Sequence, residues 1–302
     1  MKSSLKVLVL LVLAVLVLSA CSGLANTTAP AATNAPADTT APAASSAASA
    51  SQSSCLGSAD TAIVDLNCRE ITIAVENAYL PFNYIMVSTG EAGGWDYEAF
   101  NEICTRLHCT PKFVETAWDG LIQSVSAGQI DVGADGITIT DERKQSADFS
   151  DGYVQIQQRL LVRKGETRFS SIEDFAADSN LLLGTQVNTT NYQTATKYLP
   201  EERIKAFDQF PFAIQALIAG DVDAVIIDEV VGLGYQGENA DQLELIGSSI
   251  SSDELGFVFK KGSDLVDPIN KALDAMKADG SLDTLNQKFF GPDFKVTQDQ
   301  VK

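Results

Sequence analysis

The chain has 302 residues, of which 45% are hydrophobic, so it is long enough to bury the core of one large domain or two medium domains. Its formal net charge of −19 at pH 7 makes nucleic acid and anionic membrane surfaces poor partners. The same charge does not identify a small ligand, because an acidic protein can still bind an anion locally.

Residues 1–20 have the features of a targeting segment. Lys2 and Lys6 form a positively charged start, and residues 8–18 are almost wholly apolar but shorter than a transmembrane helix requires. The segment ends in Leu18-Ser19-Ala20-Cys21, which resembles the lipobox of bacterial lipoproteins. We therefore expect a signal peptide over residues 1–20, cleavage before Cys21 and lipidation of Cys21. An uncleaved anchor and an ordinary secretory signal are the alternatives.

Residues 21–54 are predicted to be a disordered tether that starts at the lipidated cysteine. After Cys21 the segment consists almost entirely of Ala, Thr, Ser, Pro and Asn. Such a composition cannot bury enough apolar surface to offset the entropy that is lost on ordering. We expect the tether to hold the rest of the chain away from the membrane.

Four further cysteines follow the tether: Cys55, Cys68, Cys104 and Cys109. An even set in an exported chain predicts disulfides, and four cysteines allow three pairings. We expect nearest neighbours to pair, since Cys104 lies near the end of a predicted helix and Cys109 lies just before the next strand. The alternative is that one pair stays as free, buried thiols. No zinc site is predicted, because the spacings are wrong and His108 is the only histidine.

The first folded segment alternates strands and a helix. Residues 70–75 (EITIAV) alternate as a strand, and residues 76–82 follow as a loop at its carboxyl end. Residues 97–107 are expected to form an amphipathic helix that Asp96 can cap. Residues 111–115 are the second predicted strand.

The next segment places polar groups at the end of a strand. Residues 121–126 repeat apolar side chains at helical spacing, and residues 130–134 alternate into a short strand. Gly136 and Thr138 then lie at the carboxyl end of that strand, with Arg143 one turn into the following helix. Ligands bind at this edge of an open α/β sheet. Gly136 offers bare backbone, Thr138 a hydroxyl group, and Arg143 a two-pronged donor suited to a carboxylate.

A second pattern of strands and helices begins at residue 157. Strands are predicted over residues 157–163, 181–183, 204–207 and 224–227, with helices starting near residues 170, 189 and 211. This rhythm is typical of a second open sheet of parallel character. Residues 254–260 then return to the first domain as a strand, and two amphipathic helices follow over residues 265–278 and 282–289.

The predicted fold class is therefore α/β, with two open-sheet domains joined by two hinge strands and the ligand in the cleft between the domains. Domain 1 is expected to comprise residues 55–157 and 253–302, and domain 2 residues 158–252. The two crossings lie near residues 153–157 and 252–256. A domain that is interrupted by another and joined to it by two strands can close over a ligand.

Three motifs give the chain a resemblance to a known family. They are Trp118-Asp119-Gly120-Leu121-Ile122, Gly136-Ile137-Thr138-Ile139-Thr140-Asp141-Glu142-Arg143 and Asp148-Phe149-Ser150. Together they resemble the amino-acid-binding branch of the bacterial extracellular solute-binding proteins, family 3, which are the receptors of ABC importers. The resemblance extends from about Ile71 to Gly291. It implies a type II, periplasmic-binding-protein-like fold.

The resemblance also implies roles for individual side chains. It places aromatic walls against the ligand at Tyr79 and Trp118, and it pairs the ligand's α-amino group with Asp228. The residues that it implies for the ligand's carboxylate are Thr138, Arg143 and Thr189. Packing in the core for the two aromatic residues, and capping of a helix for Asp228, are the alternative interpretations.

Residues 184–190 (GTQVNTT) are similar to the family's Gly-x-Gln-x-Gly-Thr-Thr turn, with Asn188 in place of the usual second glycine. Asn is the next best residue for a left-handed backbone, so the turn can survive. Free N–H groups at the start of a helix favour an anion, and Thr189 and Thr190 add hydroxyl groups. All three residues are therefore candidates for ligand binding.

Two acidic residues bear on the identity of the ligand. Glu76 lies where cation-binding members of the resembled family use a carboxylate, and Asp135 lies where this family more often has a small residue. Buried carboxylates without partners are costly, so the pair favours a cationic ligand or a protonated state. We expect arginine first and lysine second, with glutamine or another polar amino acid as the alternative. In the opposing interpretation, Asp135 caps a turn and Glu76 points to solvent.

The predicted function is the extracytoplasmic capture of a free amino acid and its delivery to an ABC permease in the membrane. We expect a monomer, anchored by lipid at Cys21 to the outer face of the cell membrane or located in the periplasm. No cofactor is predicted. An enzyme resembling the cyclohexadienyl dehydratases is one alternative, although the chain has no Ser-His-Asp set and no phosphate loop. A ligand-sensing receptor component is another, although no signalling segment is recognised after Phe289.

Overall fold

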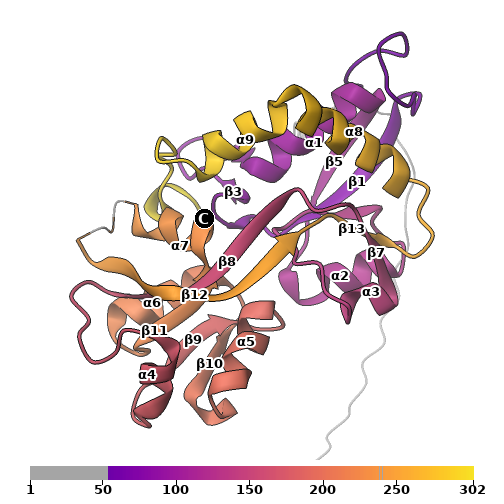
Figure 1. Ribbon diagram of the computed structural model, residues 1–302. Coiled ribbons are helices and arrows are strands. Elements are labelled where there is room, and N and C mark those ends of the chain that lie inside the picture. Colours follow the sequence, from indigo (N-terminus) through magenta and orange to yellow (C-terminus); the bar gives the residue numbers. More distant parts are fainter. Residues whose placement is uncertain (1–53, 238, 240) are drawn as a thin grey trace, which may run out of the picture. The chain divides into compact units, whose positions relative to one another are not determined.

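The computed structural model describes residues 54–237, 239 and 241–302, and these form a mixed α/β fold (Figure 1). The predicted signal peptide, the lipidation site Cys21 and nearly all of the predicted tether lie outside the described residues. Within the described part of the chain, every helix is too short or too polar to cross a membrane.

The first sheet has the strand order β5-β1-β6-β13-β7. Its strands are β1 (Arg69–Val75), β5 (Cys109–Glu115), β6 (Val132–Gly133), β7 (Ala147–Phe149) and β13 (Val258–Lys260). Strands β1, β5 and β6 are parallel, and β13 is antiparallel to both β6 and β7. The strand that was predicted over residues 130–134 is therefore present, but only two residues long.

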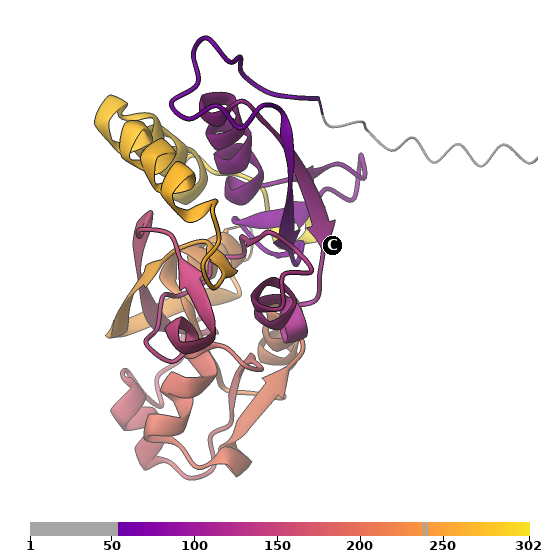
Figure 2. The ribbon, with the colours of Figure 1, turned by 90° about the vertical axis from the view of Figure 1, so that its right-hand side faces the viewer.

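Helices cover both faces of this sheet. They are α1 (Trp95–Leu107), α2 (Trp118–Ser126), α3 (Arg143–Ser146), α8 (Val266–Asp279) and α9 (Ser281–Phe290). Ile71, Ile73 and Val75 of β1 pack in the core that includes α1, α8 and α9, whereas Ala74 packs in the core that includes α2. In Figure 2, α1 lies between the two C-terminal helices and strands β1 and β5. Alternate side chains of one strand thus bury both faces of the sheet.

The start of α1 corrects one prediction, because Asp96 does not cap this helix. The helix begins at Trp95, after Gly94, whose φ is 125°. A Cβ atom at Gly94 would lie 2.3 Å from the carbonyl oxygen of Phe82, so the backbone can turn this tightly only at glycine. Asp96 lies within the first turn, where its fully buried carboxylate accepts a hydrogen bond of 2.9 Å from Asn83 Nδ2. Burial raises the pKa of Asp96 to about 8.

The second sheet has the order β10-β9-β11-β8-β12. Its strands are β8 (Val154–Arg163), β9 (Leu183–Gln186), β10 (Ile204–Phe207), β11 (Ala224–Asp228) and β12 (Leu243–Leu255). Strands β9, β10 and β11 are parallel, but β8 is antiparallel to β11 and to β12. The predicted parallel character thus holds for only three of the five strands.

Helices also cover both faces of the second sheet. They are α4 (Ile172–Ala177), α5 (Thr190–Tyr198), the short 3₁₀ helix η1 (Glu201–Arg203), α6 (Phe210–Ala219) and α7 (Glu229–Gln236). Ala224 and Ile226 of β11 pack in the core that includes α4 and α5, whereas Val225 and Ile227 pack in the core that includes α6 and α7. This burial on both faces explains why β11 reads as a continuous apolar run.

Two long strands, β8 and β12, run side by side along much of their length (Figure 1). Residues 154–157 of β8 are paired with residues 252–255 of β12. The single strand predicted over residues 254–260 is divided, because β12 ends at Leu255 and β13 begins at Val258. Gly256 lies at the break, where its N–H donates to the carbonyl oxygen of Ile137 at 3.0 Å. Residues on either side of Gly256 thus belong to different sheets.

The remaining elements are short. They are β2 (Ala78–Tyr79), β3 (Asn83–Ile85), β4 (Ala92–Gly93) and the 3₁₀ helix η2 (Gln298–Gln300). Both predicted disulfides, Cys55–Cys68 and Cys104–Cys109, are present, with Cα–Cα distances of 5.2 and 4.7 Å. The nearest-neighbour pairing is therefore confirmed.

Candidate functional site

One pocket brings together the ends of several strands and the loops that follow them. Ten of the eleven residues that were predicted to bind ligand line it: Glu76, Tyr79, Trp118, Asp135, Gly136, Thr138, Arg143, Thr189, Thr190 and Asp228. These residues come from both halves of the predicted bilobed fold. The carboxyl ends of strands in the two sheets therefore face a common space.

Asn188 is the predicted residue that does not line this pocket. Its backbone is left-handed, with φ of 58°, as the comparison with a glycine turn predicted. Its side-chain Nδ2 donates to Asp119 Oδ1 at 3.0 Å, in a neighbouring hollow that Trp118 also lines. The structure thus gives Asn188 a role in shaping the turn and in a contact beside the pocket.

Three lining residues were missed by the sequence analysis: Gln186, Asn191 and Phe210. Gln186 is the glutamine of the turn that was identified over residues 184–190, and Asn191 follows that turn directly, so the turn itself was the signal that could have found them. Phe210 begins α6 after a strand, and its ring lies 5.3 Å from that of Tyr79. An aromatic residue at a helix start carries no signal that separates a binding role from a packing role.

Backbone geometry brings Gly136 close to an aromatic ring. Its φ is 56°, and a Cβ atom there would lie 2.8 Å from Cε1 of Tyr79. Glycine is therefore required both by the left-handed backbone and by the ring. Tyr79 is held in turn between the rings of Phe82 and Phe210, with centroid distances of 5.5 and 5.3 Å.

Arg143 is the cationic group of the pocket. Its Nη1 donates to the carbonyl oxygen of Thr138 at 2.8 Å, and its guanidinium carbon lies 5.4 Å from the centre of the Trp118 ring. Burial lowers the pKa of Arg143 to about 10, although nearby carboxylates act in the opposite direction. Arg143 takes part in none of the ion pairs formed by the described residues. Its remaining donors can therefore bind an anion.

Hydroxyl and N–H groups surround the same end of the pocket. The hydroxyl oxygens of Thr138 and Thr190 are 3.2 Å apart, and Gln158 Nε2 donates to the Thr190 hydroxyl at 3.1 Å. Thr189 caps α5, because its hydroxyl accepts the N–H of Tyr192 at 3.1 Å. This cap confirms the predicted helix start near residue 189 and places the start of a helix at the pocket.

Three buried carboxyl groups line the rest of the pocket, and none of them forms an ion pair among the described residues. Gln186 Nε2 donates to both oxygens of Glu76, at 3.0 and 3.2 Å. Asn83 Nδ2 donates to Asp135 at 2.6 Å, and the Tyr79 hydroxyl donates to Asp228 at 2.6 Å. All these partners are neutral, so the carboxyl groups lack a compensating positive charge.

The environment of these carboxyl groups favours their neutral forms. Burial raises the pKa of Asp228 to about 6. Burial also raises the pKa of Glu76 and that of Asp135, and Asp135 is shifted further because it lies near Glu76. The interpretation in which Glu76 points to solvent is wrong, because only 6% of this residue is exposed. The pocket thus holds one cationic side chain, which can bind an anion, and three carboxyl groups, which a cation would stabilise in their ionised forms.

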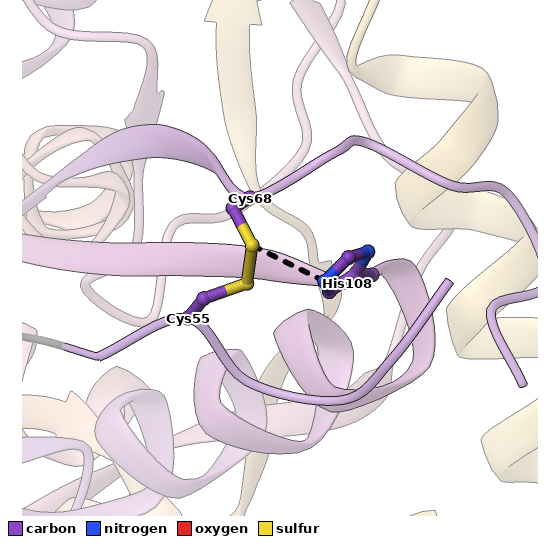
Figure 3. Close-up of side chains that lie close together, drawn as sticks. All are labelled: Cys55, Cys68 and His108. Carbon is purple, nitrogen blue, oxygen red and sulfur yellow. Dashed lines mark hydrogen bonds between the residues drawn. A yellow bond between two sulfur atoms is a disulfide. The ribbon is translucent and has the colours of Figure 1, made fainter. Parts of the chain in front are cut away.

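A group of possible metal ligands lies outside the pocket. Ligand atoms of Cys55, Cys68 and His108 lie within 4.8 Å of one another (Figure 3). The two sulfur atoms are joined in a disulfide, however, and zinc is bound by thiolates. The cluster is therefore not a metal site in this form of the protein.

Comparison with known proteins agrees with the resemblance that the motifs carry. Residues 71–292 match the bacterial extracellular solute-binding proteins, family 3. The L-cystine-binding protein TcyJ of Escherichia coli strain K12 is 28% identical, covering 74% of this chain and 83% of that protein. An L-arginine-binding protein of Pseudomonas aeruginosa is 29% identical, covering 74% of this chain and 89% of that protein.

A solved structure gives the same result. An ancestral arginine-binding protein bound to glutamine is 34% identical and has a TM-score of 0.68, over 74% of this chain and 98% of that one. The type II fold predicted from the motifs is thus confirmed. These relatives are named as binding proteins and not as enzymes, in agreement with the predicted class. Since the family match covers residues 71–292, the chain belongs to the bacterial extracellular solute-binding proteins, family 3.

Proposed function

We propose that this protein binds a free amino acid in the pocket and passes it to an ABC permease. The observation that carries the proposal is Arg143, a half-buried guanidinium that lines the pocket and has no ion-pair partner among the described residues. The ligand's carboxylate would bind Arg143 together with Thr138 and Thr189. The names of the relatives, which refer to cystine and arginine, support an amino acid as the ligand.

The α-ammonium group is assigned to Asp228. This carboxylate is 2% exposed and accepts hydrogen bonds from Tyr79 and Asn191, both neutral. An ammonium group would supply the missing positive charge. One charge-assisted hydrogen bond contributes about 1.5–3 kcal/mol, so a few of them support a micromolar dissociation constant, about −8 kcal/mol.

The preferred ligand is proposed to be cationic, arginine before lysine. Glu76 and Asp135 are both buried and face the pocket with amide partners only. A guanidinium group beside them would offset the cost of ionising both carboxyl groups. Trp118 lines the pocket and offers an aromatic face for its stacking, whereas the Tyr79 ring already stacks on Phe82 and Phe210. Glutamine remains the alternative, since its amide could bind the same groups in their protonated form.

Binding is proposed to involve closure of two domains about β8 and β12. The division is that of the sequence analysis, with residues 55–157 and 253–302 in domain 1 and residues 158–252 in domain 2. Hydrogen bonds already cross this division from Trp118 Nε1 to the carbonyl oxygen of Val187 at 3.1 Å, and from Tyr79 to Asp228. Lipid anchoring at Cys21 and a monomeric state complete the proposal.

Calorimetric titration of the unliganded protein with arginine, lysine, glutamine and glutamate tests the proposal. We expect the tightest binding for arginine and the weakest for glutamate, because glutamate would add a third acidic group to Glu76 and Asp135. Tightest binding of glutamine would refute the cationic specificity but keep the amino-acid site. If none of these four amino acids gives a heat of binding, the other common amino acids are titrated in the same way. Absence of binding by all of them would refute the site itself.

A further inference from the structure

A cluster of reactive groups lies where the described chain begins, and the ligand pocket does not use it. The disulfide between Cys55 and Cys68 lies beside His108, whose Nε2 is 3.1 Å from Cys68 Sγ (Figure 3). The other ring nitrogen, Nδ1, lies 2.8 Å from Asp65 Oδ1. Cys68 is exposed and Cys55 is half-buried, so small molecules in solution can reach the cluster.

Asp65 decides which nitrogen of the imidazole carries a hydrogen. Its carboxylate accepts the N–H of Asn67 at 2.7 Å, and this hydrogen bond, followed by that with His108, lowers the pKa of Asp65. An ionised carboxylate only accepts hydrogen bonds, so Nδ1 must be the donor. Nε2 therefore faces the sulfur of Cys68, and when the ring is doubly protonated its N–H points at that sulfur. A thiolate at Cys68 would accept this hydrogen bond.

His108 is held firmly in this position. Its backbone is left-handed, with φ of 52°, and it joins the end of α1 to the start of β5. The second disulfide, Cys104–Cys109, spans this turn, and the carbonyl oxygen of His108 accepts the N–H of Cys68 at 2.9 Å. The buried disulfide thus fixes the turn that aims the imidazole at the exposed disulfide.

We propose that Cys55–Cys68 is a thiol-exchange site for small thiols, in which His108 makes Cys68 the leaving group. A small thiolate, RS⁻, attacks Cys55 Sγ, the new R–S–S–Cys55 bond forms, and the bond to Cys68 breaks. The electron pair goes to Cys68 Sγ, and the resulting thiolate accepts a hydrogen bond from the Nε2–H group of the doubly protonated His108 ring. A lower pKa of the leaving thiol speeds the exchange. Attack by a second RS⁻ on R–S–S–Cys55 releases RSSR, so the small thiols supply both electrons and both cysteines are reduced.

Exchange at this site is expected to be reversible. Backbone hydrogen bonds hold the segment in place without the disulfide: Leu56 N–H to Cys109 O, Ile63 N–H to Arg106 O, and Leu66 N–H to Leu107 O, at 2.8–2.9 Å. The two sulfur atoms therefore stay close after reduction. Cys104 and Cys109, in contrast, are both fully buried, so their disulfide is shielded from thiols in solution and serves as an internal control.

Identifying which cysteine of the wild-type protein forms the mixed disulfide with glutathione tests whether His108 or solvent exposure decides the site of attack. The full chain is incubated with reduced glutathione under nitrogen, quenched early with iodoacetamide, digested and analysed by mass spectrometry. Exposure alone predicts attack on Cys68, the more exposed cysteine, whereas the His108 contact predicts a glutathione adduct on Cys55. We expect the Cys55 adduct in about tenfold excess, with Cys104–Cys109 still oxidised. An adduct mainly on Cys68, or equal loss of both disulfides, would overturn the proposal.

The variant His108→Asn tests the imidazole itself. Asn tolerates the left-handed backbone at this position but is too short to reach the sulfur. We expect exchange to be about tenfold slower, the midpoint potential of the disulfide to be about 30 mV more negative, and the preference for Cys55 to be lost. Unchanged regioselectivity in a variant with the wild-type melting temperature would rule out a role for His108.

Discussion

At the scale of single residues, the pocket is lined by ionisable groups that form no ion pair among the described residues. Arg143 donates to a backbone carbonyl oxygen, and Glu76, Asp135 and Asp228 accept only from neutral groups. Buried charges without partners cost free energy, so a ligand that supplies both signs of charge is bound more favourably than a neutral one.

Arg143→Ala should weaken amino-acid binding by roughly 10- to 100-fold or more, because a charge-assisted pair contributes about 1.5–3 kcal/mol. The fold should persist, since the guanidinium makes no ion pair among the described residues. Calorimetry on the variant is the measurement. Arg69→Ala is the matched control, since Arg69 pairs with Asp264 on the surface and lies outside the pocket. Equal affinities in wild type and Arg143→Ala would rule out this assignment.

Asp135→Asn should reduce the preference for arginine over glutamine by about tenfold or more, because the variant removes one carboxylate from the acidic end. The ratio of the two dissociation constants is measured by titration. Asp96→Asn is the matched control: both carboxylates accept from Asn83, but only Asp135 lines the pocket. A ratio that changes equally in both variants would mean that Asn83, and not the charge in the pocket, is responsible.

At the scale of elements, the disulfides and the helix–strand turn hold the edge of the first sheet together. Cys55–Cys68 spans 13 residues of sequence and joins the start of the described chain to the residue before β1. Cys104–Cys109 spans 5 residues and joins α1 to β5. In the chain-entropy model, the longer loop is worth more stability.

Replacing Cys55 and Cys68 together by serine should lower the free energy of unfolding by about 3 kcal/mol. Chemical denaturation without reductant, compared with wild type, measures the loss. In the same denaturant the wild-type protein should show no reactive thiol at any of the four paired cysteines. Two or more free thiols among them would contradict the disulfide assignment.

At the scale of the whole molecule, four buried carboxyl groups with raised pKa values link stability to pH. They are Glu76, Asp96, Asp135 and Asp228. A carboxyl group with a higher pKa in the folded state binds more protons there than in the unfolded chain. Stability therefore falls as pH rises through the window between the unfolded and the folded pKa. For Asp228 this window ends at about pH 6, and for Asp96 at about pH 8.

The melting temperature of the unliganded protein should therefore decrease from pH 5 to pH 8. Carboxylates with lowered pKa values affect stability in a different pH range. The pKa values of Glu166 and Asp279 are both lowered to about 2, so these two groups lose their stabilising effect only below pH 4.5. Calorimetric scans in about 0.5 M salt, which screens the net charge of −19, make the measurement. The slope should be shallower in Asp96→Asn. A melting temperature that rises over this range would contradict the predicted linkage.

Local patterns in the sequence were sufficient for much of this protein. Alternation and helical spacing predicted most of the strands and helices, because burial of one face leaves a periodic trace in the chain. Neighbouring cysteines predicted both disulfides, and the motif at Gly136, Thr138 and Arg143 predicted a cluster that lines one pocket. These features depend on residues close together in sequence or on the shared end of a sheet.

Only the tertiary structure decided where side chains with two possible partners lie. The sequence predicts that Asp96 caps a helix. In the structure the tight turn at Gly94 places Asp96 in the first helical turn, where its carboxylate accepts a hydrogen bond from Asn83. Phe210 carried no sequence signal for a role in the pocket, and only the packing of α6 brings it against Tyr79 there. Residues 254–260 read as one strand, yet pairing with different partners divides them between two sheets. In each case the deciding contact joins residues far apart in the chain, and local periodicity does not record such contacts.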